Sequence, residues 1–411
     1  MANPGLQKIV GEPAVKRSTF RIAIASLLSF ASLVVIVSPL AADAPASPAA
    51  PRIDSVVISV PQPQAVSPAV IWFDDFDDEP LAYTESDGPN VDAEAFGGSG
   101  RSMLSHYPQE GRGVGNRKVF FGDSPTGKVV RRGETFTDVY WRIYIKHQAG
   151  WTGGGPAKLS RATSMVSPNW AQAMIAHVWS SGEALTLDPA SGVRDGRIVT
   201  TRYNDFANLR WLGNRPASNF PLHSTQESGR WVCVEARAKL NTPGELDGLN
   251  QLWIDGRLEA ERQNLDWRGD YDGHGINAVF LESYWNDGSP VTQSRWIDNF
   301  VISTEPIGPV VCPRNPELIR TPPAEADGAT SWQVEVATFA EPQRLVWRSS
   351  PITSGDRVRV DAESGQFVDG QAARNSLDPD RLYHFRIRQT AGNGRTSAWS
   401  PWHQTVRTAA E

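Results

Sequence analysis

The sequence lacks the features that mark several broad classes of protein. The formal net charge is only −6 over 411 residues, and no cluster of Lys and Arg alternates with aromatic residues. Nucleic acid is therefore not expected as a partner, whereas an acidic polymer remains compatible because a local basic surface can exist in a mildly acidic chain. No convincing amphipathic helical pattern interrupts the chain after residue 69. The patterns that remain are those of strands and turns.

Cysteine is also scarce, with only Cys233 and Cys312. Near the N-terminus, basic residues precede an apolar run over 22–37 and then small residues, which is typical of a secretory signal. We predict that residues 1–42 are a signal peptide or, if uncleaved, an N-terminal anchor that is the chain's one membrane contact. The protein is then expected to be secreted, periplasmic or at the cell surface. In an oxidising compartment the two cysteines are predicted to form a disulfide, with two separate buried thiols as the alternative.

The rest of the chain divides by composition. Residues 43–68 are rich in Pro, Ala and Ser, which cannot bury enough apolar area to fold, so we predict a semi-extended linker there. Residues 69–312 carry strand after strand, and a proline-rich junction then opens a last segment over 313–411.

Alternation of apolar and polar residues along 231–240 predicts a strand with one buried face. Asp255-Gly256 predicts a tight hairpin after a second run, because both central residues of a type I′ turn need positive φ. Further strands are expected at 70–73, 118–121, 135–145, 173–179, 197–201, 252–254, 278–284 and 295–303. These patterns predict an all-β fold, with a large antiparallel sandwich over 69–312.

Four stretches in this order carry a family resemblance: WFDDFDDEP, VYWRIYIKHQAGWTGGGPAKL, WVCVEARAKLNTPGELDGLNQLWIDG and SRWIDNFVIST. The set resembles the concanavalin-A-like jelly rolls of secreted polysaccharide lyases, especially the alginate and glucuronan lyase type, and it shares turns with laminin-G-like lectin domains. The resemblance implies a jelly-roll β-sandwich and a polysaccharide partner. The stretch GGGPAKLSR departs from the family pattern, because it inserts Pro156-Ala157 and lacks the Pro-Gly that follows in the family.

The segment 313–411 has the length of a small antiparallel sandwich. Leu377, Pro379 and Tyr383, followed by the stretch GNGRTSAWS, resemble the fibronectin type III pattern. The resemblance implies that the Tyr383 hydroxyl bonds back to the chain, and that Trp332 and Trp347 are core aromatics.

The residues predicted to carry chemistry follow from what cleavage beside a uronic acid needs. It needs a cation or amide at the carboxylate, a base for the C5 proton and an acid for the leaving oxygen, and it requires no cofactor. The candidates are Arg142, Lys158, His177 and Tyr284 as catalytic residues, and Lys146, Gln148, Arg161, Trp285 and Asn286 as substrate contacts. The alternatives are a hydrogen-bonded core histidine for His177 and ordinary core aromatics for Tyr284 and Trp285.

Two carboxylates suggest a metal site. In jelly rolls of this resemblance the first and last strands are neighbours, so Asp75 and Asp298 are predicted either to hold a structural Ca²⁺ or to form a solvated acidic turn.

Three functions remain open from the sequence. The first is carbohydrate recognition by the jelly roll, and the second is a lyase that cleaves a uronate-containing polymer by β-elimination. The third is a structural or adhesive surface protein without a sugar site. Glycoside hydrolysis ranks below lyase activity, because Glu235 alternates with Arg237 and Lys239 as an ordinary polar strand face does.

Overall fold

The computed structural model describes residues 52–56, 67–78, 82–213, 215–321, 329–368, 370 and 374–410. Every regular element in these described ranges is a β-strand, so the all-β prediction is confirmed. The predicted signal segment lies outside the described residues, as does most of the predicted linker. Within the described ranges we find no helix with the length and hydrophobicity that a bilayer crossing requires.

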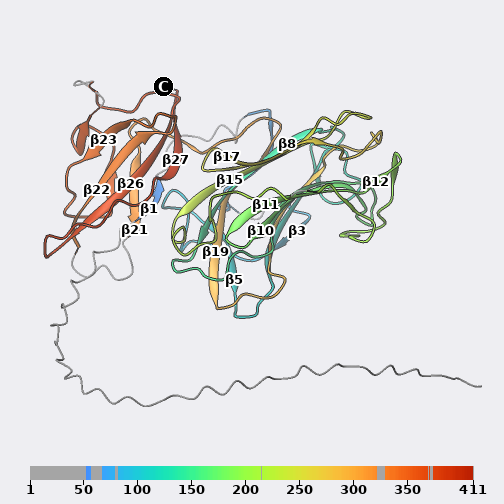
Figure 1. Ribbon diagram of the computed structural model, residues 1–411, viewed down its shortest axis with the longest axis horizontal. Helices are drawn as coiled ribbons and strands as arrows, with labels where there is room; N and C mark the ends of the chain where they lie inside the picture. Colours follow the sequence, from blue (N-terminus) through green and yellow to red (C-terminus); the bar gives the residue numbers. More distant parts are fainter. Residues whose placement is uncertain are drawn as a thin grey trace, which may run out of the picture. The chain divides into compact units, whose positions relative to one another are not determined.

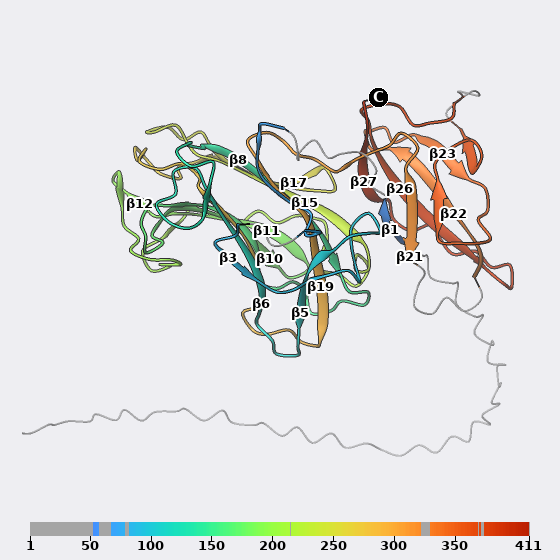
Figure 2. The ribbon, with the colours of Figure 1, turned by 180° about the vertical axis from the view of Figure 1, so that it is seen from behind.

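Most of the predicted jelly roll is a sandwich of two eight-stranded sheets, which we call the β8 sheet and the β10 sheet (Figures 1 and 2). The β8 sheet runs in the order β17 (Arg257–Leu265), β16 (Gly248–Ile254), β15 (Trp231–Lys239), β8 (Asp138–His147), β19 (Gln293–Ser303), β5 (Ser102–Tyr107) and β4 (Asn90–Val91), and β2 (Val70–Asp74) also pairs with β19. The β10 sheet runs in the order β14 (Arg210–Trp211), β11 (Ala184–Ser191), β10 (Gln172–Ser181), β9 (Lys158–Met165), β18 (Ala278–Tyr284), β6 (Gly113–Phe121) and β3 (Glu85–Asp87), and β7 (Val129–Val130) also pairs with β6. A separate hairpin joins β12 (Val193–Arg194) to β13 (Arg197–Ile198). Because each sheet buries one face against the other, the two outer faces are the surfaces on which a site can be built.

Strand β15 corresponds to the strand predicted over 231–240. Its apolar positions Val232, Val234, Ala236 and Ala238 are buried in the main core, as the alternation predicts. Both turn residues after β16 have positive φ, with 49° at Asp255 and 81° at Gly256, so the hairpin prediction is confirmed.

Strand β10 shows which face of its sheet is buried. Met174, Ala176 and Val178 belong to the main core between the sheets. The alternate residues Ile175, His177 and Trp179 therefore point to the outer face of the β10 sheet, because successive side chains of a strand alternate in direction. Polar and aromatic residues collect on this face.

The C-terminal segment forms a smaller sandwich. One sheet has six strands in the order β20 (Val311–Cys312), β27 (His403–Thr408), β26 (Leu382–Ala391), β22 (Ala329–Thr338), β23 (Leu345–Ser349) and β25 (Gly365–Phe367). The other has three strands in the order β1 (Arg52–Val56), β21 (Glu317–Thr321) and β24 (Arg357–Arg359). Trp332 and Trp347 lie in its core as predicted, and the Tyr383 hydroxyl accepts the Asp378 N–H at 3.0 Å. The fibronectin type III assignment itself stays a prediction.

Strand β1 was not predicted from the sequence. It lies inside the predicted 43–68 linker, yet it pairs with β21 from Arg52 opposite Thr321 to Val56 opposite Leu318. In Figures 1 and 2 the blue strand lies beside the orange one. The small sandwich is therefore built from segments on both sides of the large one.

The predicted disulfide is not supported. Cys233 and Cys312 are both free and buried, and they belong to different core clusters. Burial raises the pKa of both thiols above its ordinary value. The alternative of two separate buried thiols describes the structure.

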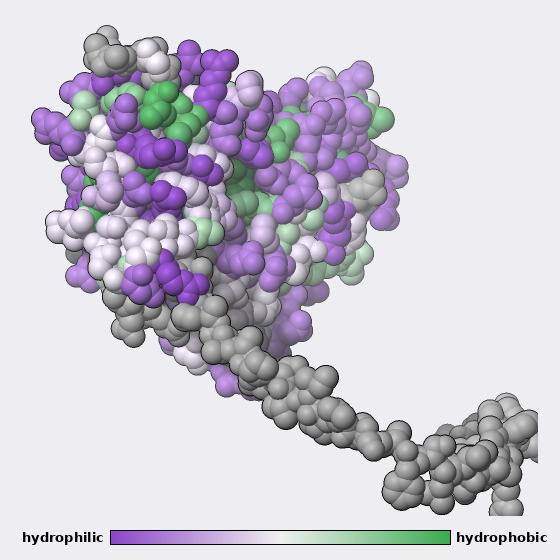
Figure 3. Space-filling view, turned by 60° about the vertical axis from the view of Figure 1, so that its left-hand side comes forward, coloured by the Kyte–Doolittle hydropathy of each residue, from purple (hydrophilic) through white to green (hydrophobic). Residues whose placement is uncertain are grey.

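The described surface is largely hydrophilic or neutral on the side seen in Figure 3, where hydrophobic areas are small. The exposed large hydrophobic side chains of the described residues are Phe206, Trp211, Leu246, Leu258, Tyr284, Val291 and Val368. The three aromatic members of this set, Phe206, Trp211 and Tyr284, belong to the β10 sheet or to the loop that leads into β14.

Candidate functional site

Strand register places two rows of side chains on the outer face of the β10 sheet. Residues that pair directly across neighbouring strands share a face of the sheet. The first row crosses β11, β10, β9, β18, β6 and β3 and consists of Asp188, His177, Arg161, Phe280, Lys118 and Glu85. The second row crosses β10, β9 and β18 and consists of Trp179, Lys158 and Tyr284. Four residues predicted from the sequence, Lys158, Arg161, His177 and Tyr284, therefore lie on one face.

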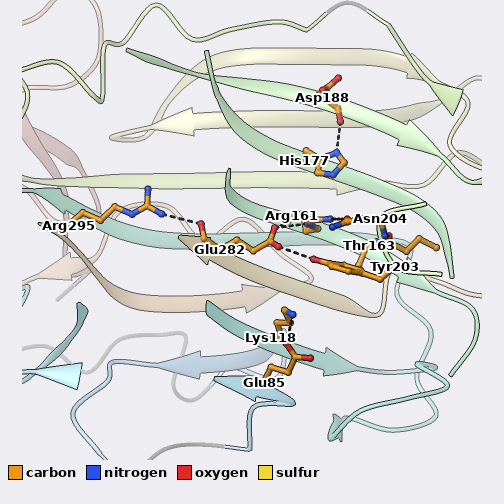
Figure 4. Close-up of polar contacts among 11 residues, drawn as sticks. Glu85, Lys118, Arg161, Thr163, His177, Asp188, Tyr203, Asn204, Glu282 and Arg295 are labelled. Atoms are coloured by element: carbon orange, nitrogen blue, oxygen red, sulfur yellow. Dashed lines mark hydrogen bonds and ion pairs between the residues drawn. The ribbon is translucent and has the colours of Figure 1, made fainter. Parts of the chain in front are cut away.

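Arg161 and Glu282 form the buried centre of this face (Figure 4). The Arg161 Nε and Nη2 atoms donate to Glu282 Oε2 at 2.8 and 2.5 Å. The Tyr203 hydroxyl donates to the other carboxylate oxygen at 2.9 Å, and Arg161 Nη1 donates to Asn204 Oδ1 at 2.7 Å. Burial alone would raise the pKa of Glu282, but the charges of Arg161 and Lys158 bring it below its ordinary value. The carboxylate is therefore ionised and fixed by three donors.

Lys158 and Tyr284 lie beside this centre. The Lys158 ammonium is 4.7 Å from the centre of the Tyr284 ring, within the range of a cation–π contact. Burial lowers the pKa of Lys158, while Glu282 opposes that shift and Arg161 and Lys118 add to it. Tyr284 is 37% exposed and Lys158 is half-buried, so an amine and a phenol reach the surface together.

His177 is enclosed rather than exposed. Its ring lies 4.1 Å from the Trp179 ring and 5.8 Å from the Trp211 ring, and none of its surface is accessible. Nδ1 lies 2.9 Å from the Asp188 carbonyl oxygen, while Nε2 has no hydrogen-bond partner among the described residues. Burial, with a smaller contribution from Arg161, holds the pKa of His177 well below its ordinary value, so the ring is neutral. The alternative prediction, a hydrogen-bonded histidine among aromatics, matches these surroundings.

The structure does not bring Arg142, Lys146 and Gln148 to this face, because they lie on or just after β8 in the other sheet. Arg142 donates to the carbonyl oxygens of Gly308 and Asn299 at 3.2 and 3.4 Å. Lys146 donates to Glu94 at 2.6 Å, and the Gln148 side chain accepts the Ser294 N–H at 3.0 Å. In the described chain these side chains connect parts of the scaffold.

Trp285 and Asn286 follow Tyr284 at the end of β18. Trp285 is buried and packs 5.7 Å from the Tyr107 ring and 5.8 Å from the Trp151 ring, as its core alternative predicts. Asn286 is exposed and lies two residues after Tyr284.

Asp75 and Asp298 occupy different environments. Asp298 is buried and accepts the main-chain N–H groups of Phe96 and Asn299 at 2.8 and 2.6 Å. Asp75 is half-buried and accepts the Asp77 N–H at 3.4 Å. Among the described residues no group of three or more His, Cys, Asp or Glu side chains is arranged to hold a metal ion. The calcium site stays a prediction.

Glu235, considered above for hydrolysis, has a scaffold role. Its two carboxylate oxygens accept the N–H groups of Ile307 and Gly308 at 2.9 and 2.7 Å.

Several residues of the outer face were not predicted from the sequence, among them Lys118, Tyr203, Phe206, Trp211 and Glu282. Lys118 and Glu282 lie in predicted strands, and strand alternation would have placed them on one face had the pairing of β6 with β18 been known. Tyr203 and Phe206 lie in the loop before β14, where no periodic pattern exists.

Comparisons with known proteins give likenesses at the level of structure. No family model matches the sequence, and no curated protein matches it. An endo-β-1,4-glucuronan lyase from the fungus Trichoderma reesei is 13% identical, with 57% of this chain and 96% of that chain covered and a TM-score of 0.39. An alginate lyase from a Chlorella virus is 12% identical, with 54% and 93% covered and a TM-score of 0.39. An alginate lyase from Aplysia kurodai is 14% identical, with 53% and 86% covered and a TM-score of 0.36. The candidate site therefore rests on the contacts of this chain itself.

Proposed function

We propose that the outer face of the β10 sheet binds a uronate-containing polysaccharide. The observation that carries this proposal is the exposed Tyr284 ring beside the Lys158 ammonium, 4.7 Å away. Pyranose rings have apolar faces that stack on aromatic side chains, and an ammonium group pairs with the carboxylate of a uronic acid. The pair thus offers two contacts that an acidic sugar needs, an aromatic ring for stacking and a cation for the carboxylate.

The charges on this face support an anionic ligand. Arg161 is paired with Glu282, and Lys118 is paired with Glu85. In the part of the chain that the structure describes, no ion pair joins Lys158 to a carboxylate; it contacts an aromatic ring instead. The Lys158 charge is therefore available to a ligand.

A second function, β-elimination on the same polymer, would use the same pair, because the Lys158 ammonium can neutralise a uronate carboxylate and the Tyr284 phenol lies beside it. Burial lowers the pKa of Lys158 because it disfavours the charged ammonium. A ligand carboxylate beside Lys158 would favour the charged form again, and this attraction would contribute to the binding of the ligand. With the carboxylate neutralised, the Tyr284 phenol oxygen would accept the C5 proton as its own proton passes to the leaving oxygen, the C4=C5 double bond would form, and the C4–O bond would break.

Affinity gels and an absorbance assay test both functions on residues 43–411. We expect retention on at least one of alginate, glucuronan, heparin or pectin, and none on neutral dextran. Lys158→Ala should weaken retention about tenfold or more at low salt, whereas Lys239→Ala, on the β8 sheet, should not. No retention on any acidic polymer would refute the binding proposal.

Elimination produces an unsaturated uronate that absorbs near 235 nm. If the second function is correct, absorbance rises with the wild type and Tyr284→Phe abolishes the rise while retention persists. Retention without a rise in absorbance leaves the protein as a binding protein.

A further inference from the structure

An aromatic track continues from the proposed sugar site towards the edge of the β10 sheet. We define it as Trp179, Trp211 and Phe206. Trp179 pairs directly with Lys158 across β10 and β9, and its ring lies 6.0 Å from that of Trp211. The Trp211 ring is in turn 6.0 Å from the Phe206 ring, with the two planes inclined by 29°. Cross-strand pairs and ring contacts thus run without a break from Tyr284 to Phe206.

The loop that carries the outer part of this track is held in place. Asp205 accepts the Thr201 N–H and the Asn208 side chain, both at 2.9 Å. Asn204 N–H donates to the Gln172 side chain at 3.0 Å, and Trp211 pairs with Ala190 of β11. The aromatic rings are therefore presented by an ordered segment, so little conformational entropy is lost when a ligand stacks on them.

The two outer rings of the track are exposed and lie outside the main core. Trp211 is 40% exposed and Phe206 is 42% exposed, while the inner face of the Trp211 ring packs 5.8 Å from the His177 ring. Exposed aromatic side chains that stack on one another beside charged groups are typical of ligand contacts.

A cation lies at this end as well. Arg215 is exposed; it pairs with Asp188 at 3.2 Å, and its guanidinium lies 6.0 Å from the centre of the Trp179 ring. An aromatic face again lies beside an exposed cation, but the Arg215 charge is paired with Asp188, so stacking on the rings is the main contact that this end offers to a sugar chain.

We propose that Trp211 and Phe206 form a second subsite for the same uronate-containing polysaccharide, so that one polymer chain lies across the strands from Tyr284 to Phe206. This inference rests on the proposed function. Four strand-to-strand steps separate β18 from β14, which is about 19 Å at ~4.8 Å per step. The track is long enough for several consecutive sugar units, so affinity depends on oligosaccharide length.

The test is calorimetric binding of defined uronate oligosaccharides, from the dimer to the octamer, of whichever polymer the gels retain. We expect affinity to rise with length until the oligosaccharide reaches Trp211. Trp211→Ala and Phe206→Ala should each weaken binding of the octamer about tenfold and leave the dimer unchanged. Leu258→Ala, which removes an exposed apolar side chain from the other sheet, serves as the matched control.

Salt dependence separates the two subsites. Stacking is insensitive to ionic strength, so the Trp211→Ala factor should be the same at low and high salt, whereas the Lys158→Ala factor should shrink as salt rises. Trp211→Tyr should recover most of the affinity.

Octamer binding that Trp211→Ala and Phe206→Ala leave unchanged would overturn the second subsite while leaving the Lys158 site in place. Absence of binding by every oligosaccharide would overturn the proposed function itself, and the second subsite with it.

Discussion

Arg161 donates two hydrogen bonds to a single oxygen of Glu282 across strands β9 and β18, and the side chain of neither residue is more than 11% exposed. A buried guanidinium left without its carboxylate loses the attraction that offsets its desolvation. The pair therefore holds together β9 and β18, the two strands that carry Lys158 and Tyr284.

We predict that Glu282→Gln destabilises the large sandwich by about 3 kcal/mol, because it leaves the Arg161 charge uncompensated. The measurement is urea unfolding followed by tryptophan fluorescence. Asp266→Asn, which breaks the exposed pair with Arg210, is the control and should cost less than about 1 kcal/mol. Equal costs for the two variants would contradict the prediction.

Acid should destabilise the protein through the pair His147 and His223, whose rings are buried and joined at 3.1 Å between Nε2 and Nδ1. Burial, followed by Arg295, lowers the pKa of His223 from 6.5 to about 3. A histidine with a lowered pKa in the folded state contributes stability above its unfolded pKa, and that contribution is lost as the pH falls from about 6.5 towards 3.

The measurement for this prediction is the melting temperature against pH. His223→Asn should flatten the fall between pH 6.5 and 3, the two pKa values of His223. His106→Asn, at an exposed histidine, should leave the profile unchanged. Parallel profiles for the wild type and His223→Asn would contradict the assignment.

Both cysteines should be present as thiols in the purified protein. We expect two alkylations by iodoacetamide after denaturation without reductant, and very slow alkylation in the native state, because both thiols are buried with raised pKa values. Intact mass spectrometry gives the count. A mass without alkylation before reduction would show a disulfide instead.

Removal of β1 should weaken the small sandwich specifically. In a chain that starts at residue 61, the amide protons of β21 that face β1 lose their partners. Hydrogen exchange should then be faster in β21 and unchanged in β10, which serves as the internal control. Unchanged protection of β21 would show that β1 contributes nothing to this sheet.

The sequence predicts β15 well because its alternation is regular and reflects burial of one face, and it predicts β18 from a short run of apolar residues over 278–281. It misses β9, because the stretch 153–156, which ends two residues before Lys158, consists of three glycines and a proline and is typical of a loop. Of the predicted residues that share the outer face, His177 and Tyr284 lie in predicted strands, whereas Lys158 and Arg161 were proposed from the family resemblance of the Gly-rich stretch and not from a predicted strand.

The rest of the site depends on which distant strands pair with one another, and a single sequence does not show this pairing. Arg142 and Lys146 lie on β8, which belongs to the other sheet, so they lie away from Lys158. Trp211 and Phe206 come from a loop whose position depends on contacts with β11 and β10. The disulfide prediction was also wrong, because an oxidising compartment permits a disulfide chemically but does not bring the two thiols together.

The pairing of β1 with β21 also determines how the chain responds to proteolysis. The large sandwich is connected to the small one twice along the chain, once between β1 and β2 and once between β19 and β20. One cut between β1 and β2 leaves the later connection intact, and β1 stays attached through its hydrogen bonds to β21. Release of the large sandwich therefore requires two cuts, one on each side of it.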